Sequence, residues 1–331
     1  MKIALDAMGS DNAPRVEVDG AIAAIEESPE LEVTLVGQEQ MVASAHGRLP
    51  DRVSLVPAAQ TVGMHESPYE VVKRKRDSSM AVCMNLLKSG EVSAMVSAGN
   101  TGAVMAYALT TLGVIPGVHR PTLGVVFPTS KGSTLVLDVG ANVDTKPLQL
   151  FQFALMGTTA AAYLFRKANP SVGILNIGRE DSKGNDLTAA ASKLLKESEL
   201  NFTGNIEGND LLQGAVDVAV CDGFVGNILL KYTEAMGEVL SAMLDGYLDS
   251  KSKYRMRRWF SKPVLHEFIN RLDYERQGGA LMLGVNGTVI CAHGRSTAQA
   301  IKNALHTATE AATGNLTGHI RERFARVEAA A

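Results

Sequence analysis

Short apolar runs that end in a glycine turn and continue as a helix recur along this sequence. In the clearest case, the apolar run Val216 to Val220 ends at Asp222-Gly223, and an amphipathic pattern then extends from Asn227 to about Leu248. This pattern predicts a buried strand, a tight turn and a long helix. Alternation of strands and helices along the chain predicts an α/β protein built on a mostly parallel sheet.

The glycine turns at these strand–helix junctions are candidate anion sites. A helix that begins directly after a strand presents unpaired backbone N–H groups and the positive end of its dipole, and such helix starts commonly bind phosphate. Two junctions of this kind suggest two walls of one cleft, although each is also compatible with an ordinary tight turn. The candidate phosphate-binding residues are Gly99, Asn100, Thr101 and Gly102 in the first junction (residues 97–103), and Asp222, Gly223, Gly226 and Asn227 in the second (residues 221–227).

Composition limits the class of protein. The chain has 331 residues, 46% of them hydrophobic, which suits one large α/β unit or two lobes that share a sheet. A net charge of −3 gives no general attraction to nucleic acid. We expect no signal peptide, because the sequence enters a predicted strand at once, and no apolar run reaches the ~18 to 20 residues that span a bilayer. We therefore expect a cytoplasmic or peripheral protein. The three cysteines lack metal-type spacing and are expected to be reduced core residues.

A dense polar cluster follows a hairpin predicted over residues 121–139, which makes the centre of the sheet mixed. The cluster contains Asp138, Asn142, Asp144 and Lys146. The two aspartates are suitable ligands for a hard metal ion, but the neighbouring lysine favours an ion-pair network that orders a phosphate loop. We therefore favour the network and predict no metal.

Three other predicted strand ends carry candidate site residues. Asp6 follows the first strand, Lys183 lies on a glycine-flanked loop before a helix, and His293 follows the last strand. Ligands of α/β proteins bind at the carboxyl ends of parallel strands. His293 suits acid–base chemistry or a hydrogen bond to an oxyanion, and Lys183 suits a cation that reaches into a crevice. A structural or solvated role explains each of them as well.

Residues 67–90 are predicted to form a helix with a capping pattern at Ser67 and a stop at Gly90. The helix carries four consecutive cations, Lys73 to Arg76. Because consecutive residues cover all faces of a helix, one or two of these cations are candidates to face an anionic ligand. A solvated face is the simpler explanation.

A basic and aromatic segment lies near the end of the chain. Residues 251–262 contain six lysines or arginines and no acid, and an amphipathic helix follows from Pro263. Such a segment suits an anionic membrane surface or an acidic protein, although a solvated basic turn before a packed helix explains it too. The candidate contact residues are Arg255, Arg257, Arg258, Trp259, Phe260 and Leu265.

Several motifs of nucleotide-binding and nucleophilic enzymes are missing. The first strand is not followed by GxGxxG, and the sequence contains neither GxxxxGK[ST] nor GxSxG. What remains is a set of polar strand ends that suit a phosphate-sized anion. They favour a reaction in which phosphate is the nucleophile and the protein forms no covalent intermediate.

Six motifs together resemble the bacterial phosphate acyltransferase family, PlsX. They are LDAMGSDNAP (5–14), SAGNTGA (97–103), LDVGANVDTKP (137–147), IGREDSKGN (177–185), CDGFVGNILLK (221–231) and GGALMLGVNG with AHGRS (278–296). The motifs are collinear and span nearly the whole chain.

The resemblance implies transfer of a long-chain fatty acyl group from acyl carrier protein to inorganic phosphate. The acyl phosphate then serves glycerol-3-phosphate acylation in phospholipid biosynthesis, and no cofactor is implied. The family's fold is a three-layer α/β/α arrangement with a mostly parallel sheet and mixed central strands, similar to isocitrate and isopropylmalate dehydrogenases and to phosphotransacetylase. We expect a homodimer whose catalytic unit covers residues 1–331 as two lobes sharing a sheet, with a basic-aromatic helical protrusion over residues 247–276.

The resemblance also assigns roles. We hypothesise that Lys183 neutralises phosphate and the developing oxyanion, that Asn227 donates a hydrogen bond, and that His293 and Ser296 close the cleft. The basic-aromatic segment is expected to contact acyl carrier protein or the inner face of the cell membrane, where a glycerol-3-phosphate acyltransferase is embedded. Two alternatives stay open: an oxidoreductase of the isocitrate dehydrogenase-like fold, and a non-catalytic membrane scaffold for lipid-synthesis enzymes.

Overall fold

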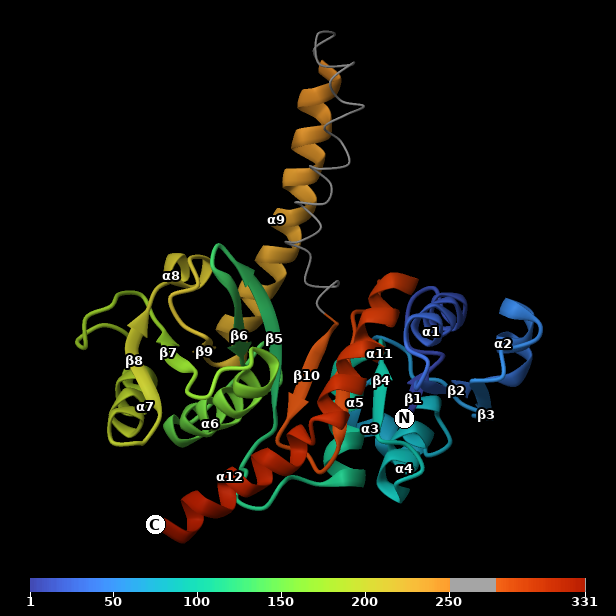
Figure 1. Cartoon of the computed structure of the whole chain (residues 1–331), viewed down its shortest axis with the longest axis horizontal. Coiled ribbons are helices and arrows are strands. Elements are labelled where there is room, and N and C mark those ends of the chain that lie inside the picture. Colours follow the sequence, from blue (N-terminus) through green and yellow to red (C-terminus); the bar gives the residue numbers. More distant parts are fainter. Residues whose placement is uncertain (251–277, 331) are drawn as a thin grey trace.

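A computed structural model describes residues 1–250 and 278–330 of the chain. Its strands form one eleven-stranded sheet with helices on both faces (Figure 1). The strands are β1 (Lys2–Asp6), β2 (Glu32–Gly37), β3 (Val53–Pro57), β4 (Ala94–Ser97), β5 (Thr122–Thr129), β6 (Gly132–Leu137), β7 (Ser171–Leu175), β8 (Asn201–Ile206), β9 (Val218–Val220), β10 (Ala280–Leu283) and β11 (Thr288–Cys291). The helices are α1 (Arg15–Glu27), α2 (Glu39–His46), α3 (Pro68–Arg74), α4 (Ser79–Ser89), α5 (Thr101–Tyr107) with the π-helical turn η1 (Ala108–Leu112), α6 (Pro147–Leu164), α7 (Asp186–Lys196), α8 (Gly208–Leu212), α9 (Gly223–Ser250), α11 (Ala298–Thr313) and α12 (Leu316–Ala330).

The sheet consists of two parallel blocks joined by antiparallel strands. Its order is β3-β2-β1-β4-β11-β10-β5-β6-β9-β7-β8. Pairing is antiparallel only at β11–β10, β10–β5 and β5–β6 among the described strands. Because three antiparallel steps separate β11 from β6, the two parallel blocks run in opposite senses along the sheet. The predicted mixed centre is confirmed.

Alternating side chains divide the core into two layers around the sheet. In β1, Ile3 and Leu5 join a buried cluster with residues of α1 and α11, whereas Ala4 joins a second cluster with residues of α4. Helix α6 contributes to the first cluster, and the start of α9 contributes Leu230 to the second. This alternation follows from the two-residue period of a strand. The predicted three-layer α/β/α fold is confirmed.

The single helix predicted over residues 67–90 is wrong, because the chain forms two helices there. The Tyr107 hydroxyl lies 2.7 Å from the Lys75 carbonyl oxygen and 3.0 Å from that of Val71, so its single proton is shared between the two and closes the end of α3. Ser78 then starts α4, since its Oγ accepts a hydrogen bond from the Ala81 N–H at 3.2 Å. Side-chain capping from a distant tyrosine and a local serine therefore divides the predicted helix.

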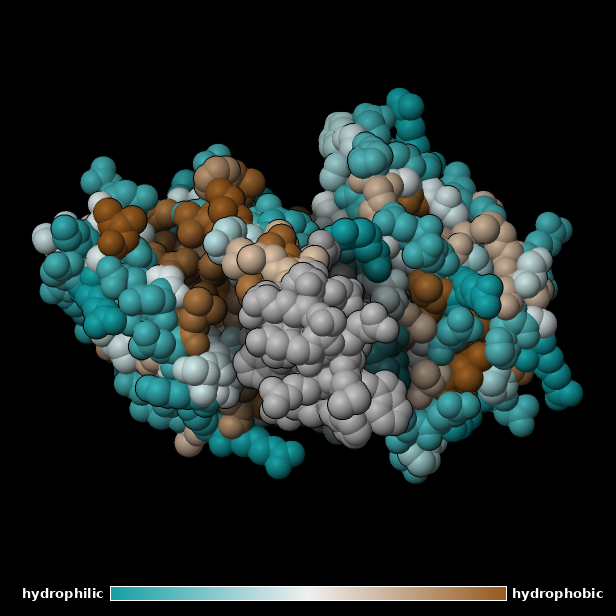
Figure 2. Space-filling view, turned by 90° about the horizontal axis from the view of Figure 1, so that it is seen from above, coloured by the Kyte–Doolittle hydropathy of each residue, from teal (hydrophilic) through white to brown (hydrophobic). Residues whose placement is uncertain are grey.

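Helix α9 begins at Gly223, four residues before the predicted start, and projects away from the sheet (Figure 1). Seen from above, hydrophobic residues gather on the half of the molecule drawn at the left (Figure 2). Exposed apolar side chains include Leu212 at the end of α8, and Phe224 and Ile228 in the first turns of α9. Most of the predicted protrusion over 247–276, with all of its candidate contact residues, lies outside the described residues. No described helix has the length and apolarity that crossing a membrane requires.

Candidate active site

A cavity of about 560 Å³ lies over the central strands, between the start of α5 and the first turns of α9. Its walls contain part of each glycine junction, so the predicted common cleft is present. Of the predicted site residues, Gly99, Asn100, Thr101, Gly102, Asn227 and His293 line it. Five polar or charged residues that the sequence analysis did not select line it as well: Asp11, His65, Lys231, Glu234 and Arg295. A second cavity of about 540 Å³, beside α6 and α12, contains none of the predicted residues.

The first junction faces the cavity with part of its backbone unbonded. The Asn100 Oδ1 accepts a hydrogen bond from the Ala103 N–H at 3.1 Å and so caps α5. The N–H groups of Thr101 and Gly102 have no acceptor in the part of the chain that the structure describes. A helix start with unpaired N–H groups on a cavity wall suits an anion.

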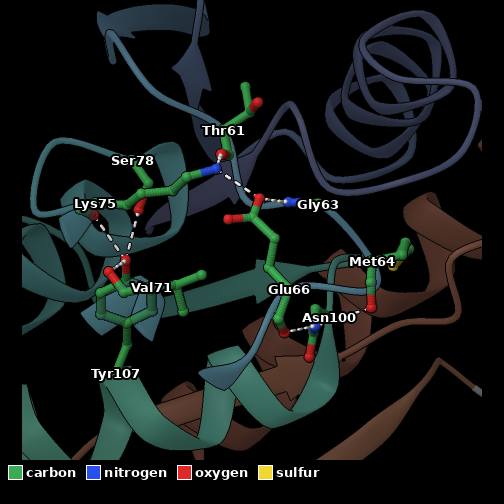
Figure 3. A network of polar contacts seen from close by, with 9 residues as sticks. All are labelled: Thr61, Gly63, Met64, Glu66, Val71, Lys75, Ser78, Asn100 and Tyr107. Atoms are coloured by element: carbon green, nitrogen blue, oxygen red, sulfur yellow. Dashed lines mark hydrogen bonds and ion pairs between the residues drawn. The ribbon is translucent and has the colours of Figure 1, made fainter. Parts of the chain in front are cut away.

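The Asn100 side chain is not itself available to a ligand. Its Nδ2 donates to the carbonyls of Met64 and Glu66, at 2.9 and 3.0 Å (Figure 3). Together with the cap, these bonds use both ends of the amide. Asn100 therefore holds the loop that carries Met64 and His65 against the cavity, rather than contacting phosphate directly.

One of the four consecutive cations does point inward, but toward a carboxylate of the same loop. The Lys75 Nζ lies 2.5 Å from the Glu66 Oε1 and donates to the Thr61 carbonyl at 2.6 Å (Figure 3). Lys75, followed by the Gly63 N–H, lowers the pKa of Glu66. The prediction that this cation faces a ligand is wrong for Lys75, because an internal acid takes that place.

Asp6 supports the first junction from behind. The carboxylate is buried, and its Oδ2 accepts a hydrogen bond from the Ser97 Oγ at 2.7 Å. The Gly99 N–H in turn donates to the same hydroxyl at 3.1 Å. Burial raises the pKa of Asp6, against the lowering effect of its hydrogen bonds. Asp6 therefore positions Gly99 and does not line the cavity.

A second buried acid, Glu17, stands near Asp6 and was missed by the sequence analysis. Its Oε1 accepts a hydrogen bond from the Ser10 N–H at 3.0 Å, whereas its Oε2 has no partner among the described residues. Burial raises the pKa of Glu17 to about 7. The loop that it holds reaches the cavity, because the Asp11 N–H donates to the Gly294 carbonyl at 2.8 Å.

The second junction has most of its N–H groups satisfied by the protein itself. The Gly223 N–H donates to the Asn142 carbonyl at 2.8 Å, and the Val225 N–H donates to the Asp222 Oδ1 at 2.8 Å. The Gly226 N–H donates to the Asp222 carbonyl at 3.0 Å. The Gly223 N–H is therefore already bonded within the protein, and anion binding by Asp222, Gly223 and Gly226 stays a prediction.

The glycines of the second junction are required by close packing. A Cβ at Gly226 would lie 1.8 Å from the Asp138 carbonyl oxygen, and one at Gly223 would lie 2.5 Å from the Asn142 carbonyl oxygen. Both values are far inside van der Waals contact. Because these two glycines have no side chain, α9 can start directly against the loop after β6.

Asp138 organises that loop, and the predicted ion-pair network is wrong. Its Oδ1 accepts from the Gly140 and Ala141 N–H groups at 3.1 and 2.9 Å, and its Oδ2 accepts from Asn142 N and Nδ2 at 2.8 and 2.7 Å. Burial raises the pKa of Asp138, against these bonds. Asp144 and Lys146 are exposed and make no ion pair within the described chain. Backbone N–H groups and the Asn142 amide, not Lys146, thus satisfy the buried charge.

Two cavity walls meet at His293, which comes from the loop after β11. Its Nε2 lies 3.2 Å from the Nζ of Lys231 on α9, and its Nδ1 lies 3.2 Å from the Arg295 N–H. The Lys231 Nζ also donates to the Glu234 Oε2 at 2.8 Å. Lys231 lies one helical turn after Asn227, so it can be identified from the sequence once Asn227 is chosen.

Ser296 is buried and does not line the cavity.

Lys183 does not line the cavity. It is exposed on the loop between β7 and α7, where its N–H donates to the Glu180 carbonyl at 3.0 Å and its carbonyl accepts from the Asn176 Nδ2 at 3.1 Å. In Figure 1 this loop lies on the outer side of the second parallel block. Its catalytic role remains a prediction.

The described residues contain no group of three or more His, Cys, Asp or Glu side chains arranged to hold a metal ion. The three cysteines are buried and unpaired, as predicted. Burial is the first cause that raises the pKa of each thiol. None of them is placed to act as a thiolate nucleophile.

Residues 1–318 match the model of a family described as "Fatty acid synthesis protein". The chain is 44% identical over 327 residues to a phosphate acyltransferase of Geotalea daltonii, covering 98% of this chain and 94% of that one. It is 45% identical over 330 residues to a phosphate acyltransferase of Pelotomaculum thermopropionicum, covering 99% and 96%.

Solved structures with the same fold include two phosphotransacetylases. One from Streptococcus pyogenes superposes with a TM-score of 0.62 at 18% identity, covering 95% of this chain and 94% of that one. The EutD phosphotransacetylase from Staphylococcus aureus gives a TM-score of 0.61 at 16% identity, covering 94% of each chain. At these identities the likeness establishes the fold alone.

Proposed function

The chain belongs to the phosphate acyltransferase family, a family of fatty acid synthesis proteins, and we propose that it transfers a long-chain acyl group from acyl carrier protein to inorganic phosphate. The acyl phosphate product then serves glycerol-3-phosphate acylation in phospholipid biosynthesis. The observation that carries this proposal is the cavity between α5 and α9. It combines unbonded N–H groups, a lysine and a histidine with an apolar floor that includes Leu123 and Val125.

The chemistry needs orientation more than proton transfer. Phosphate is an anion at pH 7, and one of its oxygens forms a bond to the thioester carbonyl carbon while the carbonyl π electrons move to oxygen. Collapse of this tetrahedral intermediate expels the carrier's thiolate, whose pKa near ~8.5 makes it a good leaving group. The protein therefore lowers the barrier by holding two anionic reactants together and stabilising the oxyanion.

In this proposal the Thr101 and Gly102 N–H groups bind phosphate, and Asn227 donates to the oxyanion. Both groups line the same cavity. The backbone donors are fixed by the Asn100 cap, so they need no reorganisation when charge develops. Asp138 and Asn142 act one step away, because they shape the loop on which α9 begins.

We place Lys183 in the active site of a second copy of the chain. We hypothesise that it neutralises phosphate and the oxyanion, yet it does not line the cavity of its own chain. On the same loop, Ile177 is 81% exposed, which is unusual for an isoleucine and suits burial against a partner. A homodimer in which this loop reaches the partner's cavity reconciles the two observations.

Subunit complementation tests this arrangement. Lys183→Ala and Asn227→Ala dimers are each expected to be inactive, and co-refolding the two variants should restore about a quarter of the wild-type activity. Half of the randomly mixed dimers are mixed, and each of these has one intact site. No recovery, with mixed dimers demonstrated by differential tags, would place both residues in one chain's site.

The proposed location is the cytoplasm and the inner face of the cell membrane. Exposed apolar side chains along α9, among them Tyr232, Val239 and Met243, continue outward from the cavity. They suit a partner chain, an acyl carrier or lipid beside the membrane-embedded acyltransferase that consumes the product. Sedimentation with anionic and neutral vesicles checks this part, since binding to neither would leave the acyl carrier or a partner chain as the occupant.

The main test is direct. The purified protein is incubated with palmitoyl–acyl carrier protein and phosphate, and acyl phosphate is trapped with hydroxylamine. We expect a hydroxamate that requires phosphate and is lost in Asn227→Ala. Folded wild-type protein that forms no hydroxamate would contradict the proposed function.

A further inference from the structure

A β-turn of residues 63–66 (the 63–66 turn) forms part of the cavity wall. The Glu66 N–H donates to the Gly63 carbonyl at 3.2 Å, and the Glu66 Oε1 accepts a hydrogen bond from the Gly63 N–H at 2.7 Å. Backbone and side chain thus close the same turn. The two residues at its tip, Met64 and His65, both line the cavity.

The 63–66 turn lies directly against the start of α5. The Asn100 Nδ2 donates to the carbonyls of the residues on either side of His65 (Figure 3), and Asn100 is the N-cap residue of α5. The chain stays close to α5 after the turn, because a Cβ at Gly102 would lie 2.8 Å from the Cγ of Pro68. The turn therefore borders the N–H groups of α5 that are open to the cavity.

The tip of the turn also reaches the loop after β11. The Met64 side chain packs against Gly294 so closely that a Cβ added to Gly294 would lie 2.3 Å from the Met64 Cε. The Gly294 carbonyl in turn accepts a hydrogen bond from the Asp11 N–H at 2.8 Å. All three residues line the cavity. A displacement of the turn would therefore change the shape of more than one cavity wall.

Lys75 holds the turn from outside the cavity. Its Nζ lies 2.5 Å from the Glu66 Oε1 and donates to the Thr61 carbonyl at 2.6 Å (Figure 3). The backbone of Lys75 is itself fixed, because its N–H donates to the Val71 carbonyl at 2.8 Å and its carbonyl oxygen lies 2.7 Å from the Tyr107 hydroxyl. Lys75 thus connects the turn to the end of α3 and to α5.

The ion pair does not itself face the ligand. Neither Lys75 nor Glu66 lines the cavity, although the two residues before Glu66 do. Their side chains are 28% and 39% exposed, and ion pairs of such exposure contribute little to global stability. Charge-assisted hydrogen bonds are nevertheless stronger than neutral ones, so this pair is suited to fixing one local conformation rather than the whole fold.

We propose that Lys75 is a positioning residue for phosphate binding. Through Glu66 it fixes the 63–66 turn, so that the wall beside the open N–H groups of α5 is in place before phosphate arrives. A wall that is ordered in the free protein costs less to order on binding. The inference rests on the proposed function, and it gives one of the four consecutive cations a role other than contact with the ligand.

Steady-state kinetics test this role. Lys75→Met removes the charge and the donors but keeps an unbranched side chain. We expect the phosphate KM to rise by about tenfold, while kcat at saturating phosphate stays within about twofold, because binding rather than the chemical step is impaired. Lys75→Arg keeps the charge and N–H donors and should recover part of the loss.

Two controls match these variants in chemistry. Lys88→Met removes an exposed lysine on α4, and Glu70→Gln breaks a surface ion pair with Arg74 at 2.9 Å on α3. Both should keep the wild-type phosphate KM.

A double-mutant cycle checks that Lys75 acts through Glu66. Glu66→Ala should raise the phosphate KM at least as much as Lys75→Met, because it also removes the bond to the Gly63 N–H. In the Glu66→Ala background, Lys75→Met should change the KM by less than about twofold, since the interaction is already lost. Effects that multiply would show that the two residues act separately and would overturn the proposal.

Carbon-13 NMR of the methionine methyl groups supplies a readout that a general loss of structure would not reproduce. The Met64 methyl resonance should be sharp in the wild type and broadened in Lys75→Met, whereas that of Met95, buried in β4, should stay unchanged. Equal broadening at both methyl groups, or an unchanged phosphate KM in Lys75→Met, would overturn the positioning role.

Failure of this inference can be told from failure of the proposed function. If wild-type protein forms hydroxamate but Lys75→Met keeps its phosphate KM, only the positioning role is wrong. If wild-type protein forms no hydroxamate, a titration of the Met64 methyl resonance with inorganic phosphate still decides the matter. A phosphate-dependent shift that needs more phosphate in Lys75→Met would then support the positioning role, and its absence in the wild type would reject it.

Discussion

The two glycine junctions are nearly alike in sequence and differ in what their backbone N–H groups contact. In the first junction, the Thr101 and Gly102 N–H groups open onto the cavity without an acceptor among the described residues. In the second, the Gly223 N–H, at the position that corresponds to Thr101, donates to the Asn142 carbonyl, whereas Val225 donates to the capping side chain just as Ala103 does in the first. The same strand–GxxG–helix pattern is thus a candidate ligand site at the first junction and a tightly packed contact between a helix and a loop at the second.

The difference shows what a glycine-rich helix start needs in order to bind an anion. The helix dipole is present in both cases, so it does not distinguish them. The distinguishing feature is the neighbouring loop, because the loop after β6 supplies acceptors and fills the space beside the second junction. Within that loop, the Asp138 carboxylate accepts hydrogen bonds from the N–H groups of residues 140–142 and so holds its shape.

The largest expected effect lies at the second junction. Gly226→Ala would put a Cβ 1.8 Å from the Asp138 carbonyl oxygen, and backbone cannot move away cheaply. We expect the free energy of unfolding to fall by at least ~3 kcal/mol, measured by denaturant titration. Gly237→Ala on the same helix is the control, because nothing lies within 4 Å of its Cβ position. A decrease in unfolding free energy of less than ~1 kcal/mol for Gly226→Ala would show that α9 is not tightly packed against the loop after β6.

Asp138→Asn should have the next largest effect. The substitution turns one acceptor oxygen into a donor facing N–H groups of residues 140–142. Leaving these buried donors unpaired should cost ~3 kcal/mol of unfolding free energy and most of the activity. Asp144→Asn in the same loop is exposed and should stay within ~0.5 kcal/mol of wild type. Equal stability of the two variants would contradict the organising role of Asp138.

Glu17, behind the first junction, should give the protein a pH dependence of stability that extends to neutral pH. Its pKa is raised from 4.5 to about 7, so the folded state binds this proton more tightly than the unfolded chain does. The stabilisation is complete below the unfolded pKa and is lost as the pH rises through about 7. It should fall by ~2 kcal/mol between pH 5 and pH 7.

Glu17→Gln should remove that part of the pH dependence of unfolding. Denaturant titrations at several pH values measure it, with Glu26→Gln, exposed on the same helix, as the control. If both variants keep the wild-type slope between pH 5 and pH 7, Glu17 is ionised in the folded protein and the prediction is wrong.

The smallest effect on stability, with a larger one on function, is expected at the first junction. Asn100→Ala removes the cap of α5 and the two bonds to the loop of residues 64–66. Loss of the cap should cost ~1 kcal/mol of unfolding free energy. Because the loop and the α5 start both form the cavity wall, the phosphate KM should rise several-fold. An unchanged KM would separate the first junction from phosphate binding.

Much of the fold followed from local pattern. Apolar runs of strand length, amphipathic helices and the hairpin over 121–139 predicted the layers and the mixed centre correctly, because each signal is contained within about twenty residues. Strand β10 was not predicted, since Ala280–Leu283 is short and flanked by glycines. The break between α3 and α4 was also missed, because a tyrosine from α5 helps to close the first helix.

The candidate site was predictable in part. The motifs selected Asn100, Thr101, Gly102, Asn227 and His293, which the fold brings to one cavity. Lys231 ends one of these motifs, but neither Lys231 nor Glu234 was selected as a site residue, because the contact of Lys231 with His293 joins residues far apart in the chain. They also included Lys146 among the candidate phosphate-binding residues, whereas the structure leaves it exposed; Lys75, one of four cations considered as candidates, pairs with Glu66.

The sequence by itself determined which elements form, in which order, and that polar residues follow the strands. These properties depend on neighbours along the chain, and the motifs also determined the family. Tertiary structure alone decided which of those polar groups remain for a ligand. An N–H group is available only if no acceptor from elsewhere reaches it, and the acceptor for Gly223 comes from Asn142, on a different loop. Hydrogen-bond satisfaction is a property of the packed molecule, so similar junctions acquired different roles.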